Sequence, residues 1–200
     1  RLSRNISRAH NLVTIYRVLT GSMRGRRSVE HTDVLRSAVV LLHASLEDFL
    51  RGLAREHLPT AGPEAINVIP LKGAGQGMRA EKFSLGQLGQ HRGKTVDQVI
   101  EESIEAFLDR SNYNNTTDIA NLLENLGIDV SSCRSFLPEL DRMMTRRHQI
   151  VHRADCRQST GKGLHHAQSL SVTAVEKWIT TVHNFHGTIL YQLQMRAKNV

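Results

Sequence analysis

The chain has 200 residues, of which 40% are hydrophobic and 22% are charged. This is the composition of one globular domain with a single buried core, and it excludes a disordered tail or a fibre. The longest uninterrupted aliphatic run, Ala38 to Leu42, has five residues, whereas a membrane-spanning helix needs about 20. We therefore expect a soluble protein that does not bind a membrane.

The two cysteines, Cys133 and Cys156, predict no disulfide framework, because a domain of this size folds without such cross-links. The chain starts at Arg1 rather than with Met and an apolar stretch, so no secretion signal is visible. We expect a reduced, cytoplasmic protein. We also expect the chain to be a piece of a longer one, in which further domains can lie outside it.

The net charge of +7 comes from the first 28 residues, which hold seven arginines and no acidic residue. The other 172 residues carry 19 basic and 19 acidic side chains and are neutral. A one-sided basic segment is typical of proteins that bind nucleic acid or another polyanion. The alternative is that these arginines only solvate the outer face of a helix. They are Arg1, Arg4, Arg8, Arg17, Arg24, Arg26 and Arg27.

Apolar residues recur every three or four positions in residues 2–20, which predicts a first amphipathic helix. After a basic loop up to residue 28, Thr32 and Asp33 are expected to cap a long second helix that ends before Pro59. Residues 59–80 hold three of the four prolines and a glycine cluster. They predict an irregular surface insert, to which the sequence assigns no role.

The second half of the chain predicts four further helices. One follows the capping-box sequence that starts at Thr95, and a shorter one runs from Thr117 to the stop at Gly127. A third helix occupies about residues 135–155, and the closing helix about residues 172–197. The fold class is therefore an all-α antiparallel bundle, in a single domain that spans residues 1–200, with two long helices and several shorter ones.

A near-match to a phosphate-binding loop runs from Gly89 to Thr95 and ends in Gly-Lys-Thr. It has three residues between its glycines instead of four, and no apolar strand precedes it. We therefore expect a helix-capping turn there and no nucleotide cofactor.

His148 and His152 are four residues apart, a spacing that can place two metal ligands on one helix face. The arginines that flank them oppose a divalent cation, so the sequence predicts no metal site.

The stretch from Arg146 to Arg153 has side chains that suit phosphodiester chemistry. His152 could take a proton from a ribose 2′-hydroxyl or give one to a leaving 5′-oxygen. A neighbouring guanidinium could hold the phosphate and stabilise its extra charge in the transition state. On an ideal helix, however, Arg147 and His152 lie about 140° apart, whereas His148 and His152 lie about 40° apart. The pair therefore needs a distorted helix, a long side-chain reach or a second copy of the chain to converge.

The segment from Arg147 to His152 resembles the R-x4-6-H motif of the HEPN superfamily, in which the residue after the arginine is typically polar. Here that residue is His148. The layout is similar as well: an early long helix contains Ser45 to Arg51, the motif helix comes late, and a long helix closes the chain. The chain is most similar to the HEPN branch called RiboL-PSP.

This resemblance implies a helical homodimer that acts as a metal-independent endoribonuclease on RNA without a cofactor. Arg147 and His152 would be the catalytic pair, with His148 as a polar assistant and Glu47 as a supporting residue that orients the Arg or the His. The resemblance also implies a toxin–antitoxin or phage-defence role, which is compatible with an antitoxin or an additional domain outside this chain.

The alternative is a non-catalytic module of the same fold that binds RNA or a nucleotide, or only dimerises. In either case we expect RNA contacts from Arg24, Arg26, Arg27, Arg146 and Arg153.

Overall fold

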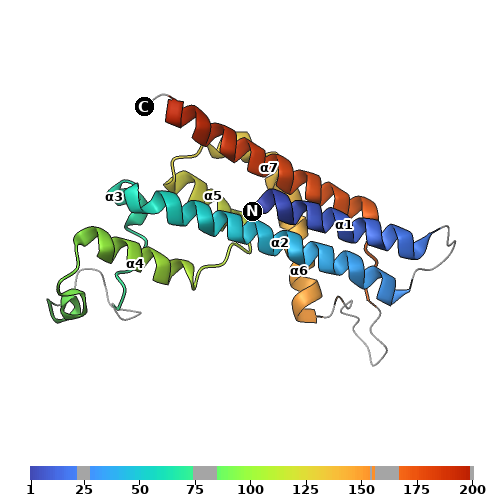
Figure 1. Ribbon diagram of the computed structural model, residues 1–200, viewed down its shortest axis with the longest axis horizontal. Coiled ribbons are helices and arrows are strands. Elements are labelled where there is room, and N and C mark those ends of the chain that lie inside the picture. Colours follow the sequence, from blue (N-terminus) through green and yellow to red (C-terminus); the bar gives the residue numbers. More distant parts are fainter. Residues whose placement is uncertain (22–27, 74–84, 154, 156–166, 199–200) are drawn as a thin grey trace.

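The computed structural model describes residues 1–21, 28–73, 85–153, 155 and 167–198. These ranges contain helices and 3-10 turns but no strand, so the predicted all-α class is confirmed (Figure 1). The helices are α1 (Leu2–Thr20), α2 (Val29–His57), α3 (Pro63–Ile66), α4 (Val96–Leu108), α5 (Thr116–Asn125), α6 (Leu137–Arg153) and α7 (Val172–Lys198). The 3-10 turns are η1 (Leu58–Thr60), η3 (Leu85–His91) and η4 (Val130–Cys133).

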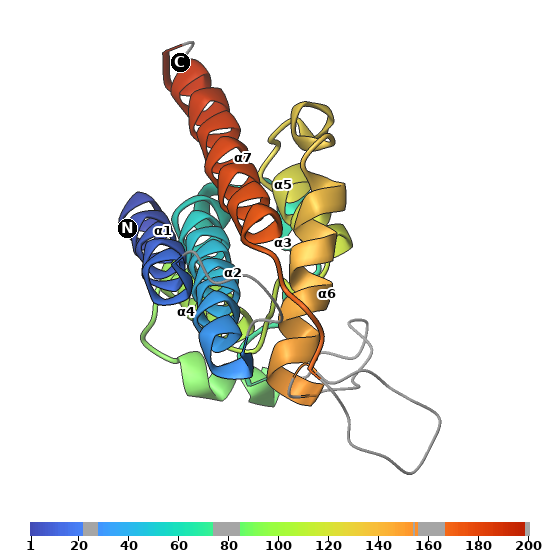
Figure 2. The same ribbon diagram turned by 90° about the vertical axis from the view of Figure 1, so that its right-hand side faces the viewer.

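The three longest helices form the centre of the bundle. Helix α1 runs antiparallel to α2 and packs along it, and α7 packs against both of them. Helix α6 contacts α2 and α7 and lies on the side of α2 away from α1 (Figure 2). Helix α4 packs against α2 and η1. No helix in the described ranges combines the length and apolar composition that crossing a bilayer requires.

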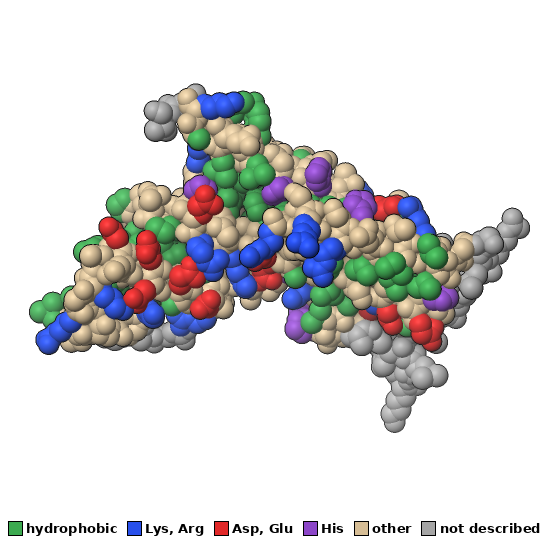
Figure 3. Space-filling model, in the orientation of Figure 1, with side chains coloured by type: hydrophobic (Ala, Val, Ile, Leu, Met, Phe, Trp, Pro, Cys, Tyr) green, Lys and Arg blue, Asp and Glu red, His purple; other side chains and the backbone are tan. Residues whose placement is uncertain are grey.

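Helix α1 buries one apolar face and exposes its arginines. Its inner face buries Leu2, Ile6, Ala9, Val13 and Tyr16. Arg1, Arg4 and Arg8 are exposed, and Figure 3 shows Lys and Arg side chains gathered across the middle of one face of the molecule. The described part of the basic segment therefore lies on the outside of a helix.

Helix α2 begins earlier than predicted, because Ser28 caps it. The Ser28 hydroxyl accepts a hydrogen bond from the backbone N–H of His31. The expected caps lie inside the first turns instead: the Thr32 hydroxyl donates to the Ser28 carbonyl, and the Asp33 carboxylate pairs with Arg36.

The predicted irregular insert is partly helical. It contains η1 and α3, and Ala65 of α3 is buried. After the insert, the capping-turn interpretation is confirmed at Thr95. Its hydroxyl accepts from the Gln98 N–H at 3.2 Å, and its own N–H donates to the Gln98 side chain at 2.9 Å.

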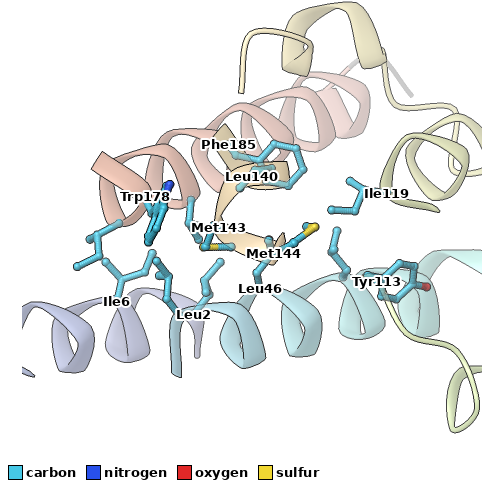
Figure 4. Close-up of a cluster of buried hydrophobic side chains, with 14 of the residues drawn as sticks. Leu2, Ile6, Leu46, Tyr113, Ile119, Leu140, Met143, Met144, Trp178 and Phe185 are labelled. Atoms are coloured by element: carbon cyan, nitrogen blue, oxygen red, sulfur yellow. The ribbon is translucent and has the colours of Figure 1, made fainter. Parts of the chain in front are cut away.

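Helix α6 is held in the bundle by one apolar face. Leu140, Met143 and Met144 are buried, and the two methionines lie between α2 and α7, close to the side chains of Trp178 and Phe185 (Figure 4). Since this face is fixed in the core, the last turns of α6 present His148, His152 and Arg153 on the remaining surface.

Candidate functional site

The residues of the Arg-x4-His pattern lie together on the last two turns of α6. Arg147 is half-buried, whereas His148, His152 and Arg153 are exposed. The preceding turn of α6 buries Met143 and Met144. These core contacts fix the helix and thereby the position of the motif residues.

The arginines of α6 fall into two groups by their partners. Arg142 pairs with Glu139, and Arg146 donates to the Asp155 carboxylate at 2.7 Å. Arg147 and Arg153, in contrast, form no ion pair with any carboxylate in the described ranges. Their positive charge is therefore not neutralised by the part of the protein that is described.

A hollow of about 290 Å³ lies beside these two arginines. The side chains that line it include no Asp or Glu, and a cationic hollow of this kind favours an anionic ligand. A guanidinium presents a planar fork of donors that matches two phosphate oxygens. The lining residues are Asn114, Met144, Thr145, Arg147, His148, Gln149 and Arg153.

His148 and His152 contact each other, as their spacing predicts. The centroids of their rings are 4.6 Å apart, with an angle of 43° between the ring planes. His148 lines the hollow, but His152 is not among its lining residues. One copy of α6 therefore places Arg147 and His148, but not His152, in the wall of the hollow.

A buried histidine that the sequence analysis did not single out lies near Arg147. His43 of α2 is 1% exposed, and burial, together with the positive charge of Arg147, lowers its pKa to about 4. His43 is therefore uncharged at neutral pH. Its Nδ1 and the Nε of Arg147 are both buried without a hydrogen-bond partner in the described structure. The sequence feature that could have indicated this buried group is a histidine on the apolar face of the second helix.

Glu47 does not contact the motif residues through any hydrogen bond or ion pair in the described ranges. Its Oε1 accepts from Arg51 Nη2 at 2.9 Å, and its Oε2 is 3.9 Å from His43 Nδ1. The same Nη2 of Arg51 donates to the Ser111 carbonyl at 2.7 Å. Glu47 thus orients Arg51, which ties the connection between α4 and α5 to α2. Arg51 itself was not singled out from the sequence.

Arg146, which was expected to contact RNA, forms several hydrogen bonds within the protein. Its terminal nitrogens donate to Asp155 Oδ2 at 2.7 Å and to the side-chain and backbone oxygens of Gln168 at 2.6 and 3.0 Å. Arg36 Nε donates to the same Oδ2 at 2.7 Å, and Asp155 is fully buried. We call Arg36, Arg146, Asp155 and Gln168 the Asp155 cluster. The terminal nitrogens of Arg146 thus bind protein oxygens, and its contact with RNA stays a prediction.

Three other expected residues, Arg24, Arg26 and Arg27, lie outside the described residues. In the part of the chain that is described, no three His, Cys, Asp or Glu side chains come together in a way that could hold a metal ion.

Comparison with known proteins identifies a family for this chain. Searches of curated proteins and of solved structures gave no match. The profile of the RiboL-PSP-HEPN family, in contrast, matches residues 3–190 and so covers most of the chain, from the second residue of α1 to within α7. The chain therefore belongs to the RiboL-PSP-HEPN family.

Proposed function

We propose that this protein is a metal-independent endoribonuclease that cleaves RNA by attack of the 2′-hydroxyl on the adjacent phosphate. HEPN domains are known for ribonuclease activity. The observation that carries the proposal is the cationic hollow, in which Arg147 has no carboxylate partner in the described ranges and stands next to His148.

The proposed reaction needs one proton taken up and one returned. A histidine removes the proton of the 2′-hydroxyl, and the 2′-oxygen then forms a bond to phosphorus. The bond from phosphorus to the 5′-oxygen breaks, and that oxygen receives a proton. The products are a 2′,3′-cyclic phosphate and a 5′-hydroxyl. His152 supplies the imidazole for one of these transfers, and its ring is oriented by its contact with His148.

Arg147 acts on the phosphate in this scheme. Its guanidinium binds the non-bridging oxygens and stabilises the negative charge that grows on them in the pentacoordinate transition state. The Nε of Arg147 is buried beside the uncharged His43, and the guanidinium forms no ion pair with a carboxylate in the described ranges.

The separation of Arg147 and His152 leads us to propose a homodimer. His152 is exposed and is not in the wall of the hollow that Arg147 lines. A second copy related by twofold symmetry would bring its own histidine to this hollow and complete the site. The dimer thus provides the two histidines that the two proton transfers require.

A non-catalytic RNA-binding module is the second candidate function, and the arginines of α1 favour it. Arg4 and Arg8 of α1 and its N-cap Arg1 are exposed, and the chain continues after α1 to the basic residues Arg24, Arg26 and Arg27. Neutralising the last three tests whether they contact RNA, because each lost phosphate contact reduces the salt dependence of RNA binding. An unchanged salt dependence would remove these arginines from the binding surface.

We place the activity in the cytoplasm, in a toxin–antitoxin or phage-defence system. Growth arrest on expression of the unmutated chain, relieved by His152→Ala, is the expected sign of a toxin. Normal growth with abundant unmutated protein would contradict a toxin that is free of an inhibitor.

Chemical substitution of the RNA tests the proposed mechanism. We expect a single 2′-deoxy substitution at a mapped cut site to abolish cleavage there, because the nucleophile is missing, while neighbouring sites are still cut. The ends of the products should be a cyclic phosphate and a 5′-hydroxyl. Equal cleavage of the deoxy-substituted RNA would show that the 2′-hydroxyl is not the nucleophile.

A further inference from the structure

A cavity of about 480 Å³ lies between η1, α3, α4 and α5, and α6 contributes no residue to its lining. Its volume is within the range of small-molecule sites, roughly 300 to 1,000 Å³. Each of the four elements adds an apolar side chain to the wall: Leu58 of η1, Ala65 of α3, Phe107 of α4 and Leu122 of α5. Such a wall suits the apolar body of a small ligand.

The charges around this cavity are opposite in sign to those around the hollow beside Arg147. Asp118 and Glu124 of α5 line the cavity, and the described residues of its lining include no Lys, Arg or His. Neither carboxylate forms an ion pair within the described ranges, although Asp118 Oδ2 accepts a hydrogen bond from the Asn115 side chain at 2.6 Å. The negative charge of the cavity therefore favours a cationic ligand.

A buried tyrosine adds a polar group without a partner to the same lining. Tyr113 is 6% exposed, and its hydroxyl has no hydrogen-bond partner in the described ranges. Figure 4 shows this hydroxyl directed away from the other labelled side chains of the core. Burial raises the pKa of Tyr113 to about 12, so the hydroxyl is uncharged at neutral pH and its oxygen can accept a hydrogen bond. A ligand that supplies the missing donor gains affinity from it.

Arg51 does not supply the missing positive charge. It is not in the lining of the cavity, and its guanidinium donates to Glu47 and to the Ser111 carbonyl. The whole chain carries a net charge of +7, so its overall field repels cations. A preference of this cavity for a cation must therefore come from its own carboxylates.

We propose that this cavity binds a small organic cation, namely a protonated primary amine on an apolar ring. The ammonium group donates charge-assisted hydrogen bonds to the Asp118 carboxylate and to the Tyr113 hydroxyl oxygen. The ring packs against Phe107 and Leu122, and Glu124 adds to the negative potential. This inference goes beyond the proposed ribonuclease activity and does not depend on it.

Tryptamine is the probe, and tryptophol, which has a hydroxyl group in place of the ammonium, is its neutral counterpart. Isothermal titration calorimetry at pH 7 measures the affinity of the unmutated protein for each compound. We expect tryptamine to bind about tenfold more tightly, because a hydrogen bond to a charged group is stronger than a neutral one by about that factor. Since both compounds carry the same indole ring, the difference reports the ammonium group.

Asp118→Asn is expected to abolish this preference, because the amide keeps the shape of the side chain but not its charge. Asp97→Asn is the matched control. Asp97 lies in the first turn of α4 as Asp118 lies in the first turn of α5, but it is exposed and does not line the cavity. It should keep the preference. Tyr113→Phe should weaken tryptamine binding at least about threefold, because one acceptor oxygen is lost.

Circular dichroism verifies the folding of each variant, and Tyr113→Phe decides the question should Asp118→Asn fail to fold. A preference for tryptamine that is lost in Asp118→Asn and kept in Asp97→Asn supports the site, whether or not the unmutated protein cuts RNA. Equal affinities for tryptamine and tryptophol, or no binding of either, would overturn the inference. Tryptamine binding that is unchanged in Asp118→Asn and in Tyr113→Phe would place the amine elsewhere and overturn it as well.

Discussion

Arg147 and Arg153 differ from the other arginines of α6 in having no carboxylate beside them in the described ranges. Neighbours along one helix thus have opposite environments: the charge of Arg146 is neutralised by the buried Asp155, while that of Arg147 remains open to a ligand. The proposed catalytic role depends on this difference. It depends equally on the shape of the guanidinium, because two parallel hydrogen bonds fix a phosphate better than one point charge.

Arg147→Lys tests the shape of the cation separately from its charge. We expect RNA cleavage to fall at least about tenfold, because a lysine cannot form the paired hydrogen bonds. The unfolding temperature should stay close to that of the unmutated protein. Arg142→Lys, an exposed change on the same helix, serves as the control and should leave cleavage unchanged. Full activity in Arg147→Lys would show that a positive charge alone suffices.

His43 predicts a pH dependence of stability. Its pKa is about 4 in the folded protein, below the ordinary 6.5 of the unfolded chain. As the pH falls from above 6.5 toward 4, the unfolded chain binds a proton that the folded protein does not bind, so stability decreases. Over that interval the loss amounts to about 3 kcal/mol.

Denaturant unfolding between pH 7 and pH 4 measures this effect. His43→Leu replaces the titrating group with an apolar side chain of similar size. Between pH 7 and pH 4 its unfolding free energy should decrease by about 3 kcal/mol less than that of the unmutated protein. An identical pH dependence in both proteins would show that His43 is not the group responsible.

At the scale of elements, the Asp155 cluster joins the end of α6 to the start of α2 and to the segment before α7. Asp155 Oδ2 accepts from Arg36 of α2 and from Arg146 of α6 at 2.7 Å each, and the Gln168 carbonyl accepts from both arginines. Asp155 also adopts a positive φ of 56°, which few residues other than glycine favour. The cluster therefore determines where α6 ends, directly after His152 and Arg153.

Asp155→Ala should destabilise the fold strongly, by about 3 to 5 kcal/mol, because it removes the buried carboxylate that Arg36 and Arg146 share, which leaves Arg146 without a carboxylate partner and Arg36 with only the exposed Asp33. Asp33→Ala is the matched control. Asp33 also pairs with Arg36, but its side chain is 62% exposed, so its loss should cost less than about 1 kcal/mol. Urea unfolding of both variants decides the point, and equal effects on stability would contradict the structural role of the cluster.

The elements that the sequence predicts well are those with a regular apolar repeat. Residues of α1 such as Ile6, Val13 and Tyr16 recur at helical spacing and are all buried. The capping box at Thr95 is equally local. The Asp155 cluster could not be predicted, because Arg36 and Asp155 are 119 positions apart and no local pattern couples them. The family resemblance placed Glu47 near the motif, whereas its hydrogen-bond partner in the described ranges is Arg51, one helical turn away.

At the scale of the whole molecule, the separate positions of Arg147 and His152 predict a twofold dimer. The mass in solution should be twice the 22.5 kDa of one chain, measured by ultracentrifugation. A chain that stays monomeric at high concentration would contradict a site shared between two copies.

Mixed dimers test whether the site is composite. Arg147→Ala and His152→Ala homodimers should both be inactive, but a purified heterodimer of the two retains one intact combination of Arg147 from one copy and His152 from the other. It should recover about half of the unmutated rate, since one of two symmetric sites remains complete. A heterodimer without activity would place both residues of each site in the same chain.

Cleavage of a mixed RNA pool in the presence of EDTA tests the central proposal most directly. The unmutated protein, Arg147→Ala and His152→Ala are compared in parallel, after their folding has been verified by circular dichroism. We predict cutting by the unmutated protein that EDTA does not reduce, and no cutting by either variant. RNA that stays intact with the unmutated protein but is still bound by it would contradict the ribonuclease proposal, and would favour the RNA-binding module instead.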